Sequence, residues 1–290
     1  MHTTLVSVEE LAAGLNAPDA ASDWVVFDCR HDLARPDAGE KAWRAGHIPG
    51  ARFAHTDRDL SGNKSGANGR HPLPTREAFA AFLADAGVED ATQIVAYDAS
   101  DGIYAARLWW LAKWIGHDAV AVLDGGLPAW QGAGFPADAQ TPEIDDAHQG
   151  RRGLAIGAPR VAQVAASRIE ADLVACERLV VDARAPERYR GDVEPLDPVA
   201  GHIPHAVNRY YKNNLDTGGR FKPVHQLRTE FDALLDGRAP GLIVHQCGSG
   251  ITACHNLLAM EVAGLPGGAL YAGSWSEWCS DPKRPVARGA

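Results

Sequence analysis

Short apolar runs alternate along the chain with longer segments whose apolar residues recur at helical spacing. The apolar runs that predict strands are residues 25–28, 94–97, 179–182 and 242–245. Helical spacing over residues 74–87, 224–236 and 251–263 predicts amphipathic helices that cover a sheet. The Ser-x-x-Glu spacing that begins at Ser7, and again at Ser167, is that of a capping box, which starts a helix. Strands that alternate with helices predict an α/β fold with a mostly parallel sheet.

The second half of the chain repeats the order of motifs found in the first half. An Asp-x-Arg triplet begins at Asp28 and again at Asp182, and a Gly-His-Ile-Pro motif follows at Gly46 and again at Gly201. Two copies of one domain explain this repeat. Because the histidines of the motif recur in both copies, we expect them to be structural. The predicted boundaries are 1–139 for a first domain, 140–160 for a linker and 161–290 for a second domain.

One strand of the second half ends at a cysteine, which a glycine-containing loop and a helix follow. The loop reads Cys247-Gly248-Ser249-Gly250-Ile251-Thr252. In parallel sheets, ligands bind beyond the carboxyl ends of the strands, where Cys247 is expected. Backbone N–H groups at the start of the next helix can stabilise a thiolate or persulfide there, and glycines permit close approach. The sequence therefore predicts a nucleophilic thiol at Cys247, with residues 248–252 holding the bound sulfur.

The corresponding loop of the first half carries no cysteine. Alignment of Gly102 with Gly250 places Ala99 opposite Cys247. Asp98, one residue earlier, would add a negative charge that opposes a bound anion. We therefore expect the first domain to be inactive and to act as a structural partner.

Composition limits the partners. The chain has 290 residues, of which 46% are hydrophobic and 22% charged, enough for one large or two ordinary domains. A net charge of -9 disfavours a nucleic-acid or anionic-membrane surface, which needs clustered Lys and Arg. An anionic substrate would therefore need a local positive site. No apolar run has membrane-spanning length and no basic segment precedes an apolar core at the N-terminus, so a cytoplasmic location is expected.

The cysteines do not suggest a metal site or a disulfide framework. Their number is odd and no two are spaced as CxxC. A zinc site is therefore not expected, and most of these thiols are expected to be buried and inert. The reaction expected for the chain, described below, implies no metal or organic cofactor. Cys279, which follows Trp278, is the one that could be exposed. The cysteines are Cys29, Cys176, Cys247, Cys254 and Cys279.

The combination of motifs resembles the two-domain rhodaneses. Two copies of Asp-x-Arg with Gly-His-Ile-Pro, and a Cys-Gly-Ser-Gly-Ile-Thr loop in the second copy only, extend the resemblance over nearly the whole chain. The loop is most similar to the mercaptopyruvate sulfurtransferase branch, because thiosulfate-preferring members more often carry charged side chains after the cysteine. The resemblance implies tandem rhodanese-like α/β domains and sulfur transfer through a cysteine persulfide.

The resemblance also implies the residues that assist the nucleophile. Arg188 matches the family position that binds the donor, and an arginine fork suits a carboxylate or sulfonate-like group. Ser249, His71 and Asp57 match a Ser-His-Asp relay of the mercaptopyruvate branch, which would protonate the leaving group. Members of that branch commonly have a second arginine where this chain has Leu196. A single arginine suits thiosulfate as well as 3-mercaptopyruvate, so the preferred donor stays open.

The expected reaction is a ping-pong cycle. Cys247 takes the thiol sulfur of 3-mercaptopyruvate, or the outer sulfur of thiosulfate, and passes it to a thiol, thioredoxin or cyanide. The alternatives are a thiosulfate-preferring rhodanese, a binding module that keeps the fold without catalysis, and a cysteine phosphatase. The retained cysteine disfavours the binding module. Phosphatase loops end in an arginine that cradles an oxyanion, whereas Ile251, Thr252 and Ala253 supply none.

Overall fold

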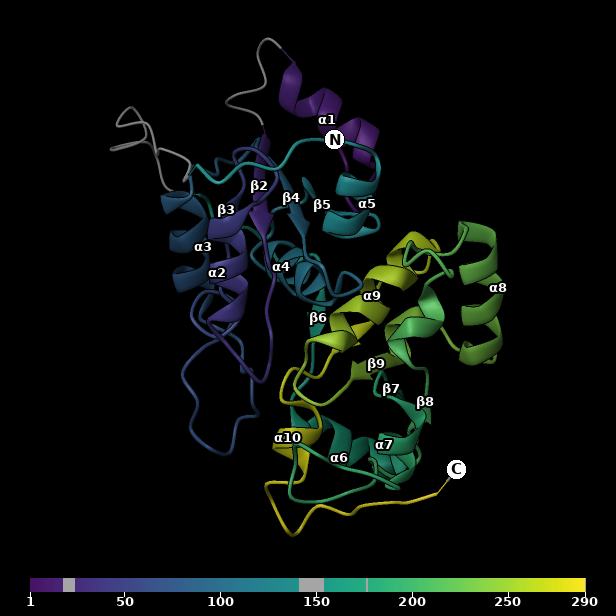
Figure 1. Ribbon diagram of the computed structural model, residues 1–290. Coiled ribbons are helices and arrows are strands. Elements are labelled where there is room, and N and C mark those ends of the chain that lie inside the picture. The colour runs from purple at the N-terminus through teal and green to yellow at the C-terminus, as the bar shows by residue number, and fades with distance from the viewer. Residues whose placement is uncertain (18–23, 141–153, 176, 290) are drawn as a thin grey trace. The chain divides into compact units, whose positions relative to one another are not determined.

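The chain divides into two compact units, each with its own parallel sheet. The computed structural model describes residues 1–17, 24–140, 154–175 and 177–289. One unit consists of Met1–Gly62 with Pro74–Arg160, and the other of Asn63–Leu73 with Val161–Ala290. Each sheet has five strands in all-parallel pairing with helices around it, which confirms the predicted fold class (Figure 1). Residues 141–153 of the predicted linker, and Cys176, lie outside the described part of the chain.

The first unit orders its strands β1-β5-β4-β2-β3. The strands are β1 (Leu5–Val6), β2 (Trp24–Asp28), β3 (Arg52–Phe53), β4 (Gln93–Tyr97) and β5 (Val120–Leu123). The helices are α1 (Val8–Asn16), α2 (Ala38–Ala45), α3 (Arg76–Asp85), α4 (Ile103–Trp114) and α5 (Gly126–Gly132). Buried residues of α1 and α5 pack on one face of the sheet with Val26 and Val95, and Phe82 of α3 packs against Phe27 on the other. Ser7 forms the predicted capping box, so the start of α1 is confirmed.

The second unit has the same strand order, β6-β10-β9-β7-β8. The strands are β6 (Ala162–Gln163), β7 (Leu179–Asp182), β8 (Val207–Asn208), β9 (Ile243–Gln246) and β10 (Ala269–Leu270). The helices are α6 (Ala166–Ala175), α7 (Pro186–Arg190), α8 (Val224–Leu235), α9 (Thr252–Val262) and α10 (Ser274–Trp278), with short 3-10 turns η3 (Tyr211–Asn214) and η4 (Pro240–Leu242). In Figure 1, α8 and α9 lie on one side of β9, and α6, α7 and α10 lie on the other.

Two local expectations in the second unit are wrong. The helix expected to be capped by Ser167 begins one residue before it, at Ala166, so the serine lies inside the first turn. The N–H of Arg168 donates to the carbonyl of Ala165 instead. The strand predicted at 242–245 is shifted by one residue, because Leu242 completes the 3-10 turn that precedes β9.

Strand pairing fixes how the two copies correspond. The aspartate of the Asp-x-Arg triplet pairs with Tyr97 in the first sheet and with Gln246 in the second. The residues that follow, Asp98 and Cys247, are therefore equivalent. The alignment that placed Ala99 opposite the cysteine is wrong by one residue, because it matched the loop glycines rather than the strands.

Candidate functional site

Cys247 lies directly beyond the carboxyl end of β9, and α9 begins at Thr252. The residue is only 2% exposed. Its Sγ accepts a hydrogen bond from the N–H of Gly250 at 3.1 Å, and its own N–H donates to Oγ of Ser274 at 3.1 Å. The thiol therefore sits in a loop with a backbone N–H group directed at the sulfur, a setting that stabilises negative charge there.

The shape of this loop depends on Gly250 and on the start of α10. Gly250 has φ +80, and a β-carbon there would lie 2.4 Å from the carbonyl oxygen of Ala272. No other residue type meets both conditions without strain. The N–H groups of Trp275 and Ser276 donate to the carbonyls of the two residues that begin the loop, at 2.9 and 3.0 Å. The backbone around the thiol is thus held from both sides.

A segment from the first half of the sequence, Asn63–Leu73, completes the second unit. Within it, Gly69 has φ +86, and a β-carbon there would lie 2.7 Å from the carbonyl oxygen of Gly273. The N–H of the next residue, Arg70, donates to Oγ of Ser276 at 2.9 Å. These contacts hold the backbone of the segment against α10, where the side chains that follow reach the cysteine loop.

Two residues of the expected relay meet in this unit. Nδ1 of His71 lies 2.8 Å from Oγ of Ser249, and both residues are buried. A histidine nitrogen bonded to a hydroxyl allows a proton to pass between them. Asp57 belongs to the first unit, where its Oδ2 lies 3.9 Å from Nε2 of His31. The structure therefore describes the contact between Ser249 and His71, and the part of Asp57 in a relay stays a prediction.

Arg188, the expected donor-binding residue, extends from α7 toward the loop. A β-carbon placed on Gly248 would lie 3.5 Å from Nη1 of Arg188. The guanidinium is held by carboxylates, since Nη2 donates to Oε1 of Glu194 at 2.6 Å and to Oδ2 of Asp197 at 3.4 Å. Its side chain is 18% exposed. Arg188 is thus a fixed positive group beside the residue that follows Cys247.

Sequence reasoning missed three charged residues around Arg188. Arg70 donates from Nη1 to Oδ1 of Asp197 at 2.6 Å, so Asp197 contacts two arginines. Glu194 accepts hydrogen bonds from both Arg184 and Arg188. Position in the sequence was the signal that could have found them. Arg70 directly precedes His71, and Glu194 and Asp197 lie on either side of Leu196, where a second arginine was expected.

Arg184 is a buried positive group that supports the site. It forms a bidentate pair with Asp182 and donates to the carbonyl of Gly201 at 2.7 Å. Its guanidinium lies 4.8 Å from the ring centroid of Trp275. Burial alone would lower the pKa of Arg184, but the negative charges of Asp182 and Glu194 raise it above its usual value. The residue is therefore charged and too enclosed to bind a donor directly.

The other described thiols do not compete with Cys247. Cys29 and Cys254 are fully buried, and burial raises the pKa of Cys29. Cys279 is 7% exposed, and burial raises its pKa to about 11. The expectation that this residue could be exposed is wrong, because it packs in the hydrophobic cluster of α10. All four cysteines of the described residues are free thiols, and no group of metal-ligating side chains occurs among those residues.

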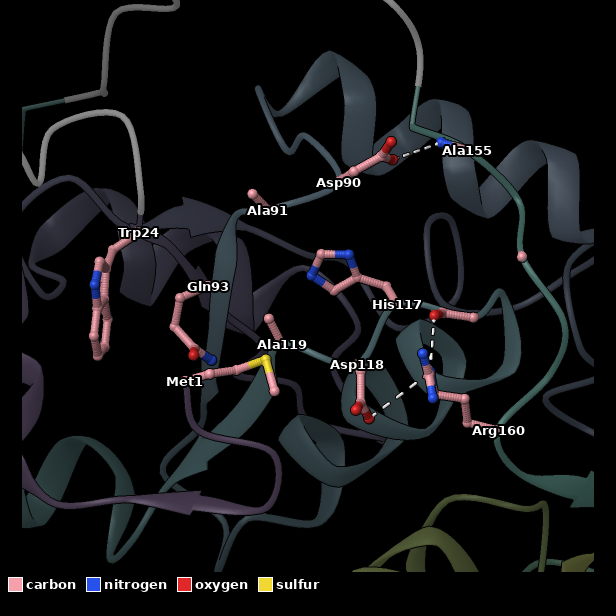
Figure 2. Close-up of a pocket in the computed structure, with 12 residues that line it drawn as sticks. Met1, Trp24, Asp90, Ala91, Gln93, His117, Asp118, Ala119, Ala155 and Arg160 are labelled. Atoms are coloured by element: carbon pink, nitrogen blue, oxygen red, sulfur yellow. Dashed lines mark hydrogen bonds and ion pairs between the residues drawn. The ribbon is translucent and has the colours of Figure 1, made fainter.

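A cavity of about 620 Å³ lies in the first unit where β4 and β5 begin (Figure 2). Its polar side chains already have partners: Asp118 lies 3.9 Å from Arg160, and Nε2 of His117 lies 2.8 Å from the carbonyl oxygen of Thr92. Burial lowers the pKa of His117, which favours the neutral ring. None of the described residues that line the cavity is a cysteine. The thiol site at β9 is therefore the stronger candidate.

The fold and the loop define the class of protein. The sequence matches the Rhodanese-like domain twice, over residues 7–133 and 161–281. The chain therefore belongs to the rhodanese family, as a tandem two-domain member. Among the helices of the described residues, none is long and apolar enough to cross a membrane.

Full-length relatives narrow the class to sulfurtransferases. The chain is 45% identical over 288 residues to a probable 3-mercaptopyruvate sulfurtransferase of Pseudomonas aeruginosa, covering 98% of each. It is 37% identical over 297 residues to a putative thiosulfate sulfurtransferase of Mycobacterium tuberculosis, covering 98% of this chain and 97% of the relative. The crystal structure of a 3-mercaptopyruvate sulfurtransferase from Escherichia coli superposes with a TM-score of 0.76 at 28% identity, covering 94% of this chain and 99% of the other. The chain is a sulfurtransferase of the rhodanese family.

Proposed function

We propose that the chain transfers sulfane sulfur from 3-mercaptopyruvate, or from thiosulfate, to a thiol acceptor through a persulfide on Cys247. The observation that carries the proposal is the buried Sγ of Cys247, which accepts a hydrogen bond from the N–H of Gly250. The guanidinium of Arg188 lies beside Gly248, the residue that follows the cysteine. N–H groups of residues 248–252 serve the persulfide in the same way. Neither the formation of the persulfide nor the transfer of its sulfur to the acceptor requires a metal or an organic cofactor.

The first half-reaction forms one S–S bond and breaks one bond in the donor. With 3-mercaptopyruvate, the thiolate attacks the donor sulfur, the C–S bond breaks, and its electron pair leaves as the enolate of pyruvate. The donor thiol loses its proton when its sulfur becomes the outer sulfur of the persulfide anion. The enolate carbon gains one proton to give pyruvate, so the number of protons is unchanged. With thiosulfate, the donor S–S bond breaks and sulfite leaves with the electron pair. In both cases Arg188 holds the anionic end of the donor.

Protonation of the enolate is the step assigned to Ser249 and His71. Their 2.8 Å contact allows the serine hydroxyl to pass a proton to the enolate carbon while the histidine replaces it. We keep Asp57 as the proposed third member of the relay, which would orient the histidine. Sulfite is stable as an anion and needs no such proton. The relay therefore favours 3-mercaptopyruvate as the principal donor.

In the second half-reaction a thiol attacks the outer persulfide sulfur and releases the Cys247 thiolate. Small thiols, thioredoxin and cyanide are the proposed acceptors, and none requires a nucleic acid or a membrane. We also propose a cytoplasmic location, which the free thiols Cys29, Cys254 and Cys279 support because a reducing compartment preserves them. Fractionation of cells that express the chain, with a periplasmic enzyme as marker, tests this assignment.

The decisive experiment compares the two donors with one acceptor, under single-turnover conditions. Mixing the enzyme with 3-mercaptopyruvate should add one sulfur atom to the peptide that contains Cys247 and release one pyruvate for each persulfide formed. Catalytic efficiency should be higher with 3-mercaptopyruvate than with thiosulfate. Turnover without persulfide on Cys247 would refute the scheme, and a strong thiosulfate preference would reverse the order of donors.

A further inference from the structure

We propose that Ser274 is a positioning residue, which holds the backbone of Cys247 so that its sulfur faces the N–H groups of the loop. This inference rests on the proposed function, because it assigns a residue to the nucleophile of that reaction. Ser274 is fully buried at the start of α10. Its Oγ accepts a hydrogen bond from the N–H of Cys247 at 3.1 Å and donates one to the carbonyl of Tyr271 at 2.9 Å.

The direction of these two hydrogen bonds defines what the hydroxyl of Ser274 can do. A serine hydroxyl has a single proton, and here that proton is donated to the carbonyl of Tyr271. Only the lone pairs of Oγ remain, and they accept the N–H of Cys247. Ser274 therefore acts through the backbone of the cysteine and supplies no proton to the sulfur.

The backbone of Ser274 is strained. Its φ is +53°, in the left-handed region that a β-carbon makes unfavourable. The other described residues that combine a positive φ with a side chain are not buried, and they are of types that tolerate this region better: Asp101, His205 and Asp236. Strain of this kind persists where the surrounding structure fixes it, and it is concentrated at functional sites. The strain at Ser274 therefore points to a role for its side chain.

The first unit has a glycine at the position of Ser274. Leu270 of β10 and Val122 of β5 are equivalent by strand register, and Ser274 and Gly126 each lie four residues further on. Gly126 has φ +57°, so the backbone conformation is shared, and glycine adopts it without strain. The less strained residue thus belongs to the unit whose loop lacks a cysteine. Beside Cys247, the same conformation carries a hydroxyl.

Without that hydroxyl, the N–H of Cys247 would lose its acceptor. Cys247 is only 2% exposed, so water has little access to replace Oγ. A buried donor without an acceptor is unfavourable, and the loop would shift toward another acceptor. The 3.1 Å hydrogen bond from the N–H of Gly250 to Sγ depends on the present position of the loop. Ser274 therefore keeps the sulfur aligned with the N–H group that stabilises its negative charge.

Donor binding should not depend on Ser274. Arg188, the proposed donor-binding residue, is held by its own hydrogen bonds to Glu194 and Asp197. Loss of the serine hydroxyl should therefore slow the attack by Cys247 and leave the affinity for the donor unchanged.

The test compares Ser274→Gly with Ser274→Ala. Both variants lack the hydroxyl, but only alanine keeps a β-carbon at positive φ, so the glycine variant should melt at the higher temperature. Both should form the Cys247 persulfide about tenfold more slowly at saturating 3-mercaptopyruvate, with the half-saturating concentration changed by less than about twofold. Ser280→Ala is the matched control, because this exposed serine just beyond α10 donates only to the carbonyl of Glu277, at 2.8 Å. It should change neither quantity.

The pair of variants separates positioning of the thiol from a purely structural role. If Ser274 were only structural, the rate would follow the melting temperature, and the glycine variant would react as fast as the wild type. That result would overturn the proposal, as would a higher half-saturating concentration at an unchanged maximal rate.

Alkylation of Cys247 by iodoacetamide, which needs no sulfur donor, should slow by a similar factor in both variants of Ser274. Mass spectrometry of the peptide that contains the cysteine measures this rate. A wild-type chain that is alkylated at Cys247 but forms no persulfide would refute the proposed function. In that case the alkylation rates would still test Ser274, and equal rates in the wild type and both variants would overturn its positioning role.

Discussion

In the first unit the residue after β4 is Asp98, whereas in the second unit the residue after β9 is Cys247. The Asp98 carboxylate accepts four backbone N–H groups at 2.7 to 3.0 Å, from Ser100, Gly102, Tyr104 and Ala105. Burial raises the pKa of Asp98, and these four hydrogen bonds act against that shift. The N–H groups that would serve a bound anion are therefore occupied by a carboxylate of the chain itself. In the first loop the N–H groups bind the Asp98 carboxylate, whereas in the second loop the N–H of Gly250 is directed at the sulfur of Cys247.

The framework around the two loops is the same. Arg30 donates to the carbonyl of Gly46 at 2.7 Å, as Arg184 does to that of Gly201. The histidine of each Gly-His-Ile-Pro motif stacks on an aromatic ring, Trp43 in the first unit and Tyr189 in the second. These histidines bond backbone carbonyls, which is the structural role expected for them. The duplicated residues support the fold, and the residues proposed to carry the chemistry are among those that differ.

The largest effect should come from moving the thiol between the two loops. Cys247→Ser should lower turnover by about 10³-fold or more, because none of the other three cysteines that the structure describes lies in this loop. Adding Asp98→Cys in that background should not restore activity. Counted from the Asp-x-Arg triplet, Ala34 stands where Arg188 stands in the second half, so the first half has no arginine at the position of the proposed donor-binding residue. The measurement is pyruvate and sulfite release by the single and double variants.

A double variant that recovered turnover would show that a thiol in this backbone suffices without the arginines. The same assay should be accompanied by mass spectrometry of both loops, since persulfide on the introduced cysteine would identify the active unit. Thermal unfolding of each variant checks that the fold is retained.

The serines of the two loops give a matched pair of variants. Ser249 and Ser100 are equivalent by strand register, but only Ser249 contacts His71 among the described hydrogen bonds. Ser249→Ala should lower kcat with 3-mercaptopyruvate by about 10²-fold, the usual range for loss of a proton-transfer group. Ser100→Ala should have no effect on either donor. Steady-state kinetics with both donors measures this difference.

Thiosulfate turnover distinguishes a proton relay from simple positioning. Because sulfite leaves without a proton, Ser249→Ala should reduce thiosulfate turnover much less than 3-mercaptopyruvate turnover. His71→Gln should follow the same pattern. Equal losses with both donors would exclude the relay and would leave Ser249 and His71 a role in holding the loop.

The filled loop of the first unit should be sensitive to the charge of Asp98. In Asp98→Asn one carboxylate oxygen becomes an NH₂ group. This group cannot accept hydrogen bonds from the two backbone N–H groups that it faces, so both lose their acceptor. The variant should unfold about 1–3 kcal/mol more easily, the cost of buried donors without partners. Asp101→Asn is the control, because asparagine tolerates the positive φ of 64° at that position. Urea denaturation measures both, and a more stable Asp98→Asn would mean that desolvation of the carboxylate outweighs its hydrogen bonds.

Much of this comparison follows from the sequence, and its limits have physical causes. Apolar periodicity predicted strands β2, β4, β7 and β9 and helices α3, α8 and α9, because the apolar residues of each element recur on the surface that it buries. Cys247, the proposed nucleophile, and Arg188 lie within recognisable motifs. Arg70 and Asp197 were missed because their contact joins residues 127 positions apart, which no local pattern encodes. The equivalence of Asp98 and Cys247 required strand register, since loop glycines can shift by one residue while the strands cannot.

The smallest predicted effect concerns a histidine that the first sheet lacks. His245 of β9 is equivalent to Ala96 of β4 by strand register, and it is fully buried with Nε2 2.9 Å from Sδ of Met260. Burial lowers the pKa of His245 to about 3. Below about pH 6.5, the unfolded chain therefore binds a proton that the folded chain excludes, and stability falls as the pH falls. The free energy of unfolding is expected to fall by about 1.4 kcal/mol for each pH unit below that point.

The His245→Leu variant should remove that slope from the second unit, because leucine cannot titrate. Hydrogen exchange of peptides from β9 and α9, followed by mass spectrometry between about pH 6.5 and about pH 5, measures local stability once intrinsic exchange rates are corrected. Peptides from β4 are the internal control, since the substitution lies in the other unit and should leave their pH dependence unchanged. If the leucine variant kept the full slope in β9, another group would be responsible, and the acid sensitivity of the second sheet would not arise from this histidine.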